Sequence, residues 1–164
     1  MTMQMIPVAV PSREEVRAFY DAYFKTLDDG RFKEWPNFFV EDCLYRIIPR
    51  ENYEAGQDAC IMQGDSKRML IDRVLAILST QVYAPRYCRR FYTGLGVVNG
   101  AGRELEVQQN LLVIHTLVGE ATKILASAAG YDRLIVTDEG CLKFVERTVV
   151  LDTELIDGTL IYPI

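Results

Sequence analysis

The sequence is very poor in histidine: His115 is the only one among 164 residues. Four cysteines are scattered along the chain, and no two stand at the short spacing of a metal-binding pair: Cys43, Cys60, Cys88 and Cys141. A Rieske iron–sulfur cluster takes two cysteines and two histidines, and a mononuclear non-haem iron takes two histidines and a carboxylate. A single histidine completes neither set, so the chain by itself cannot hold either centre.

Other absences narrow the class of protein further. No stretch approaches the roughly 20 apolar residues that cross a bilayer. The first residues, Met1 to Pro11, lack the basic segment and apolar core of a signal peptide. The net charge is −5 and the basic residues are scattered, whereas phosphate binding needs a basic stripe. We therefore expect a cytoplasmic protein with reduced cysteines, no membrane contact and no nucleic-acid partner.

What the sequence does contain is enough for a packed core. Hydrophobic residues make up 49% of the chain and charged residues 25%, which is typical of folded proteins. A chain of 164 residues buries enough surface to fold without disulfides or metals. There is no internal repeat, low-complexity segment or linker signal, so we expect one domain over residues 1–164.

Three helices are predicted in the N-terminal half. Ser12 and Glu15 form a capping box, and the apolar residues that follow recur on one helix face: Val16, Phe19, Tyr20, Tyr23 and Leu27. Gly30 suits the left-handed position that ends a helix. A short helix is expected around residues 34–39, and a third begins at Asp65 or Ser66.

The remaining segments predict a curved sheet. A first strand alternates over Cys43–Ile48. The chain after it is irregular up to Gly64, either throughout or interrupted by a short strand at Ala59–Met62. Four long segments rich in Val, Ile, Leu, Tyr and Phe follow, joined by glycine-containing hairpin turns: Arg86–Val98, Glu104–Leu117, Thr122–Thr137 and Cys141–Leu151. Glycines inside them, Gly94, Gly96 and Gly130, predict bulges or bends. Helices followed by a strongly curved antiparallel sheet indicate an α+β fold shaped like a cone.

A series of short segments runs in consistent order along nearly the whole chain: Asp29-Gly30, Glu34-Trp35-Pro36, Phe38-Phe39, Glu41-Asp42-Cys43, Tyr45-Arg46-Ile47, Arg50-Glu51-Asn52, Met69–Val74, Pro85-Arg86 and Glu146–Asp152. This pattern resembles the small (β) subunits of aromatic-ring-hydroxylating oxygenases, nearest to salicylate-, terephthalate- and anthranilate-type enzymes. The resemblance implies a nuclear-transport-factor-like cone with N-terminal helices packed in a curved antiparallel sheet. It also implies an α3β3 hexamer whose α subunit carries the Rieske [2Fe-2S] cluster, the mononuclear iron and the substrate pocket.

Three hypotheses for function follow. The first is a non-catalytic β subunit, self-associating as a trimer, that scaffolds an enzyme of aromatic catabolism; that enzyme uses O2 and NAD(P)H to hydroxylate an aromatic carboxylic acid. The second is a free-standing cone-fold isomerase or dehydratase, with candidate residues Asp21, Tyr20, Tyr23, Tyr45 and His115. Helical phase places Asp21 off the apolar face, which disfavours it as a cavity acid. The third is a homo-oligomeric module that binds a small molecule without chemistry.

Under the first hypothesis no residue of this chain is catalytic, cofactor-binding or metal-ligating. The candidate residues are then those for contacts between subunits: Trp35, Arg86, Arg89, Arg90, Arg147, Asp152 and Tyr162. Aromatic residues and arginines dominate such contacts, and the planar guanidinium binds carboxylates and carbonyls. Two alternatives stay open: Trp35 anchors a helix in the core, and the arginines lie on a solvated edge.

Three expectations concern single positions. Arg73 lies on the apolar face of its helix and needs a carboxylate partner within the subunit or across an interface, for which the candidates are Asp42, Glu146 and Asp152. His115, in an apolar strand, is expected to be buried with its hydrogen bonds satisfied. The apolar run Thr159–Ile164 is expected to dock as an added strand or against a neighbouring subunit.

Overall fold

The computed structural model describes residues 10–80 and 82–164, so most of the Met1–Pro11 stretch lies outside the described residues. In chain order the elements are α1 (Arg13–Asp28), η1 (Phe32–Phe38), β1 (Phe39–Pro49), α2 (Arg50–Glu54), β2 (Met62–Gly64), α3 (Lys67–Leu75), η2 (Ala76–Thr80), β3 (Arg86–Ala101), β4 (Glu104–Leu117), β5 (Lys123–Val136) and β6 (Leu142–Leu151). Among the described residues, none of the helices combines the length and the hydropathy needed to span a membrane.

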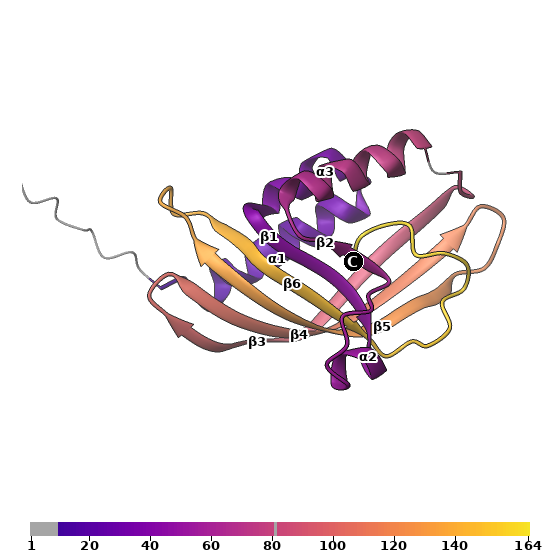
Figure 1. The fold of residues 1–164 in the computed structure, drawn as a ribbon. Coiled ribbons are helices and arrows are strands. Elements are labelled where there is room, and N and C mark those ends of the chain that lie inside the picture. Colours follow the sequence, from indigo (N-terminus) through magenta and orange to yellow (C-terminus); the bar gives the residue numbers. More distant parts are fainter. Residues whose placement is uncertain (1–9, 81) are drawn as a thin grey trace, which may run out of the picture.

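The strands form one strongly curved sheet with α1 and α3 on its concave side (Figure 1). The strand order is β2-β1-β6-β5-β4-β3. Strand β1 runs parallel to β6, whereas the other neighbours are antiparallel. The sheet does not close, because β2 and β3 remain as edges. The predicted α+β cone is confirmed.

Local signals in the sequence place α1 correctly. The Ser12 amide donates to Glu15 Oε2 (2.7 Å) and the Glu15 amide to Ser12 Oγ (3.2 Å), which completes the capping box. The buried face contains Val16, Tyr20, Tyr23, Phe24 and Leu27. Gly30, with φ 70°, takes the left-handed conformation that a helix end favours. Ser66 caps α3 by accepting from the amide of Met69.

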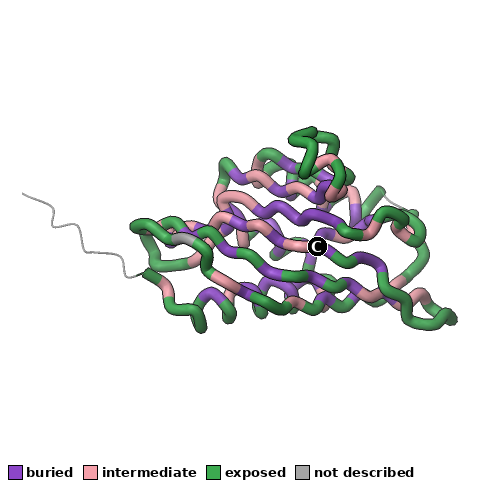
Figure 2. The backbone as a smooth tube through the Cα atoms, turned by 90° about the horizontal axis from the view of Figure 1, so that it is seen from below, coloured by how far each residue is buried: buried purple, intermediate pink, exposed green. Residues whose placement is uncertain are grey.

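The long strands also lie close to their predicted positions, and their inward and outward residues alternate (Figure 2). The register between β3 and β4 shifts between Thr93 and Gly96, where Gly94 has φ 65°. This bulge confirms the prediction for Gly94 and Gly96. No bulge forms at Gly130, whose pairing with β4 and β6 is regular. Helix α2 was not predicted, since its five residues carry no apolar period.

Candidate functional site

A buried polar cluster lies at the centre of the concave face. Asp132 on β5 and Arg147 on β6 are directly opposite each other, and their ion-paired side chains are 0% exposed. Tyr20 Oη donates to Asp132 Oδ2 (2.7 Å), and Gln109 Nε2 donates to the same oxygen (2.9 Å). The Asp132 carboxylate therefore receives three donors, from α1, β4 and β6.

Aromatic rings enclose the Arg147 guanidinium. Its central carbon lies 4.7 Å from the ring centroid of Tyr23, 5.2 Å from that of Phe144 and 5.3 Å from that of Phe24. Such contacts favour the cation, the more so where water is excluded. Burial opposes the charged form of Arg147, but Asp132 and the surrounding tyrosines together raise its pKa above the usual value. Arg147 is therefore a permanent cation inside the core.

Burial also raises the pKa of Asp132, to about 6, although Arg147 and the Tyr20 hydroxyl favour the carboxylate. The pKa values of Tyr20 and Tyr23 are raised for the same first reason, burial of the phenol. At neutral pH the cluster thus contains one carboxylate, one guanidinium and neutral tyrosines.

The raised pKa of Asp132 predicts a pH dependence of folding stability. The folded chain binds the Asp132 proton more tightly than the unfolded chain. This contribution is therefore fully present below the ordinary pKa of 3.8 and is lost as the pH rises through about 6. Denaturant unfolding of the native chain and of Asp132→Asn across this window measures it, because only the native chain should lose stability from this group. A constant difference between the two would contradict the assignment.

The C-terminal segment docks on this cluster inside its own chain. The backbone oxygen of Ile164 accepts from Tyr23 Oη (3.0 Å), Tyr45 Oη (3.3 Å) and Arg147 Nε (3.2 Å). Arg90 donates twice to the oxygen of Pro163 (3.1 and 2.6 Å). The segment forms neither a strand nor a helix. An added strand was therefore the wrong prediction, because side-chain donors replace a ladder here.

Arg73 takes part in the same docking. Its Nη2 donates to the backbone oxygens of Leu160 (3.4 Å) and Ile161 (3.2 Å). The predicted carboxylate partner within the chain was wrong, because carbonyl dipoles of the C-terminal segment meet the guanidinium instead. Pairing across a subunit interface stays a prediction. Asp42 lies exposed, while Glu146 binds Arg46 (3.3 Å) and Asp152 binds Arg50.

His115 is buried, as expected, but its hydrogen bonds are not satisfied. It is 2% exposed, and neither ring nitrogen has a partner. Its register neighbours are Cys88 on β3 and Lys123 on β5, and neither makes a hydrogen bond to the ring. A polar side chain on an apolar strand can face the core where no other polar group is within reach. The sequence pattern does not reveal this.

Replacing the unpaired His115 by an apolar residue should stabilise the folded chain. We expect His115→Leu to raise the free energy of unfolding by about 1 kcal/mol, because it removes two buried polar atoms that lost water without gaining partners. The matched control is His115→Gln, which keeps a polar group at the same site and should give no gain. Urea denaturation of the three chains decides this; a loss of stability in His115→Leu would indicate a missed partner.

The cluster offers no route for catalysis. A general base must come within hydrogen-bond reach of a substrate proton, whereas three protein donors surround the 0%-exposed Asp132. Asp21, the acid that the sequence suggested for a free-standing enzyme, is exposed and accepts from Tyr92 Oη. Among residues 10–80 and 82–164, no three histidine, cysteine or carboxylate side chains group to hold a metal.

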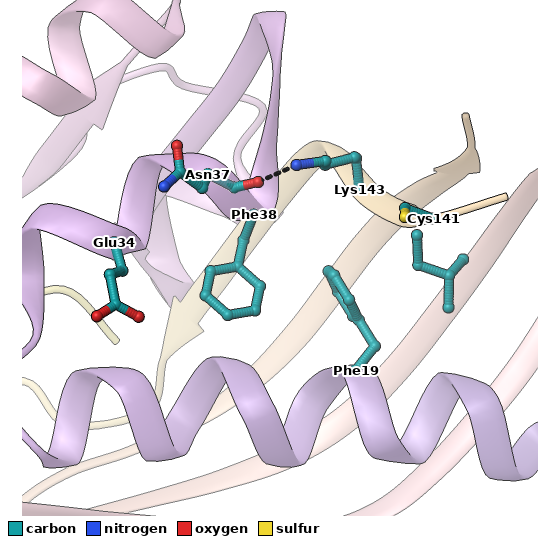
Figure 3. Close-up of a pocket in the computed structure, with 7 residues that line it drawn as sticks. Phe19, Glu34, Asn37, Phe38, Cys141 and Lys143 are labelled. Carbon is teal, nitrogen blue, oxygen red and sulfur yellow. Dashed lines mark hydrogen bonds between the residues drawn. The ribbon is translucent and has the colours of Figure 1, made fainter. Parts of the chain in front are cut away.

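A surface hollow lies between α1, η1 and the start of β6 (Figure 3). It measures about 290 Å³ and is lined by Phe19, Phe38 and Cys141, among others. Lys143 Nζ closes one side by donating to the backbone oxygen of Asn37. Glu34 and Lys143 are its only charged lining groups, so the hollow is an apolar depression without an acid–base pair set around a ligand.

The predicted contact residues fall into two groups. Trp35 and Arg147 are 0% exposed, and Trp35 Nε1 donates to Tyr23 Oη (3.1 Å). The core alternative therefore fits Trp35, and neither side chain offers surface to another subunit in this conformation. Arg90 is buried too, paired with Asp28 (2.6 Å).

The other predicted contact residues reach the surface. Arg89 is exposed and donates to the backbone oxygen of Asp28 (3.1 Å), and Arg86 is partly exposed at the start of edge strand β3. Asp152 bonds Arg50 and Ser127 Oγ, and Tyr162 stacks near Phe32 with centroids 4.7 Å apart. Their role between subunits stays a prediction.

Sequence reasoning missed an apolar patch on the outer face of the sheet. Four large apolar side chains there are exposed: Tyr87, Phe91, Leu112 and Ile124. Phe91 is directly opposite Leu112, and Arg89 is opposite Ile114, which in turn is opposite Ile124. We call these residues, with Ile114 and Arg89, the outer-face patch. The sequence does contain a signal for this patch. Along β3, the outward residues Tyr87, Arg89 and Phe91 alternate with the inward residues Cys88, Arg90 and Tyr92.

A second exposed apolar stripe follows α3 and η2 at helical spacing. Ile71, Leu75 and Leu78 are each roughly half exposed. With Lys33 and Pro36 they line a groove of about 280 Å³ against η1. Contiguous apolar surface of this kind marks contact sites more often than isolated residues do.

The chain has clear relatives among known proteins. A family model described as "Ring hydroxylating beta subunit" matches residues 23–158. The chain is 29% identical over 150 residues, 92% of each protein, to the small subunit of anthranilate 1,2-dioxygenase from Burkholderia cepacia. It is 30% identical over 151 residues to subunit beta 1 of the terminal oxygenase component of terephthalate 1,2-dioxygenase from Comamonas sp., over 92% of this chain and 97% of that one.

A crystal structure from Novosphingobium aromaticivorans, a β subunit ascribed to an aromatic-ring-hydroxylating dioxygenase, has the same fold. It superposes with a TM-score of 0.84 at 32% identity, covering 93% of this chain and 96% of that one. The sequence match and the fold thus agree over nearly the whole chain.

Proposed function

The chain belongs to the family of ring-hydroxylating β subunits, and on this basis we propose that it is the structural, non-catalytic subunit of an oxygenase that hydroxylates an aromatic carboxylic acid. Its relatives are named as subunits of anthranilate and terephthalate dioxygenases, which supports this substrate class. The whole chain, residues 1–164, acts as a single cone-fold domain in the cytoplasm. Its proposed role is to assemble the oxygenase complex.

The observation that carries the proposal is the filled interior. At the centre of the cone, where a free-standing isomerase or dehydratase needs room for its substrate, Asp132 and Arg147 neutralise each other without exposure. Ile164, 1% exposed, closes the same space. The interior therefore stabilises the subunit, and we assign its function to its surfaces.

The partner we propose is an α subunit carrying the Rieske [2Fe-2S] cluster and the mononuclear iron, in an α3β3 hexamer. The donor set of this chain does not fit either centre, since it has one histidine. Electron transfer and substrate oxidation then belong to the α subunit, and the β subunit holds three of them in place. The stripe on α3 and η2 is an apolar surface suited to such a partner.

For the contact between copies of this chain we propose the outer-face patch. A ring of three uses a heterologous contact, in which two different surfaces of the chain meet. The patch contains the exposed Arg89, and the exposed Glu104 and Glu106 lie at the far end of β4. Opposite charges on two ends of one face favour a head-to-tail arrangement.

Analytical ultracentrifugation tests the assembly. The chain alone should sediment as a trimer of 18.7 kDa subunits, and co-expression with the α-subunit gene should give an α3β3 complex. Charge reversal at Arg86 and Arg89 should weaken assembly without altering the circular dichroism spectrum. A stable monomer that turns over a substrate unaided would instead support the free-standing enzyme.

A further inference from the structure

The outer face of the sheet has a shallow hollow over β4, β5 and β6, on the side away from α1 and α3 (Figure 1). It measures about 230 Å³. Two rows of cross-strand neighbours line it: Glu106, Arg133 and Glu146 in one row, and Gln108 and Tyr131 in the next. Directly paired residues of adjacent strands point to the same side of a sheet, so these side chains face the same space.

This hollow has a surplus of negative charge. Arg133 lies 3.7 Å from Glu104 and 3.9 Å from Glu146, near the limit of ion pairing. Glu106 is exposed and pairs with no cation among the described residues. The charged groups around the hollow are four carboxylates and two guanidinium groups: Glu104, Glu106, Glu146 and Asp58, with Arg133 and Arg46. The hollow can therefore accept a further cation.

A cation without a carboxylate partner lies at the opposite end of the same face. Arg89, in the outer-face patch, is exposed and donates only to the backbone oxygen of Asp28 (3.1 Å). It is opposite Ile114, and Glu106 lies eight residues earlier on β4, which is roughly 27 Å of extended strand. Arg89 and Glu106 therefore cannot meet within one chain, although both face outward from the same sheet.

We propose that Arg89 of one copy of this chain binds in the hollow of the next copy, between Glu106 and Glu146. This pairing rests on the head-to-tail contact between copies proposed above, and it names the groups that meet there. Each copy then offers its own Arg89 on one side and its own hollow on the other. Repetition of such a heterologous contact closes a ring where the rotation between copies allows it.

The lining of the hollow suits a guanidinium. Glu106 and Glu146 offer carboxylate oxygens, which accept well from the planar fork of arginine. Tyr131 adds an aromatic ring, on which a guanidinium stacks. That ring is held by Tyr53, whose nearly parallel ring lies 5.6 Å away between centroids. Its orientation is therefore set before the neighbouring copy arrives.

The surroundings of Arg89 strengthen the pair once the two copies meet. Tyr87 and Phe91 flank Arg89 on the same face and are 68% and 54% exposed. When a neighbouring copy covers these rings, they exclude water from the charges beside them. An ion pair shielded from water is stronger than one on an open surface, because the effective dielectric constant is lower.

A charge swap in the full-length chain tests the pairing. Sedimentation equilibrium gives the dissociation constant of the proposed trimer for Arg89→Glu, for Glu106→Arg and for the double variant. Each single reversal should raise the constant about tenfold, because it brings like charges together. The double variant restores opposite charges and should return to within about threefold of the native chain. Arg89→Lys keeps the charge without the planar fork and should lie between the native chain and Arg89→Glu.

Asp72→Arg is the matched control. Asp72 is exposed on α3, on the other side of the sheet, and has no ion pair among the described residues. This variant should keep the native dissociation constant, and circular dichroism should show every variant folded. Single reversals that behave like Asp72→Arg, or a double variant weakened by both effects together, would overturn the pairing but not the trimer. A native chain that stays monomeric would overturn the contact between copies and the pairing alike.

Discussion

Replacing Asp132 by alanine should lower the free energy of unfolding by about 3–5 kcal/mol, because it leaves Arg147 as an uncompensated charge in the core. The Arg147 side chain is 0% exposed, so its charge has no contact with water. Tyr20 and Gln109 lose their shared acceptor as well. Urea denaturation of both chains measures the effect.

Two matched variants separate pairing from simple truncation. The exposed pair Arg103 with Asp138 repeats the same charges at the surface, so Asp138→Ala should cost no more than about 1 kcal/mol. The double variant Asp132→Leu with Arg147→Met should recover much of the loss, since apolar replacement of a whole buried pair is often neutral. If Asp132→Ala costs as little as Asp138→Ala, the buried cluster does not stabilise the fold as described.

The second large effect concerns self-association. Substituting Phe91 and Ile124 of the outer-face patch by aspartate should raise the dissociation constant of the proposed trimer about 30- to 1,000-fold, which corresponds to roughly 2–4 kcal/mol for residues at the centre of a contact. Both side chains are more than half exposed in the isolated chain. The fold should therefore survive, as circular dichroism and the melting temperature can verify.

Leu75→Asp is the control for this experiment. Leu75 is 55% exposed and apolar, but it lies on α3, on the other side of the sheet. Sedimentation equilibrium of the isolated chain should show an intact trimer for Leu75→Asp and dissociation for the patch variant. The opposite outcome would move the contact between copies to the helical side of the molecule.

How far the sequence predicts this molecule depends on the range of each interaction. The Ser12–Glu15 capping box and Gly30 fix α1 through contacts within a few residues, and the strands follow from their two-residue alternation. These signals are local, so the order of elements and the cone could be predicted. The bulge at Gly94 could be predicted for the same reason.

The centre of the site depends on distant partners and could not be predicted as a whole. Tyr20 and Asp132 are 112 residues apart, and Tyr45 and Ile164 are 119 apart. The position of Asp132 is visible in the sequence, because it alternates in phase with the inward residues Leu134 and Ala128 of β5. A charged side chain buried there needs a partner of opposite charge. Nothing local identifies Arg147 as that partner or predicts that Arg73 binds carbonyl oxygens.

We propose that this chain assembles an oxygenase while its partner performs the chemistry. Iron analysis of the co-expressed complex after separation of its subunits, together with oxygen consumption before and after recombining them, tests this division of roles most directly. Iron should remain only with the α subunit, this chain alone should consume no oxygen, and the recombined complex should regain activity. Stoichiometric iron on this chain, or oxygen consumption by it in isolation, would contradict it.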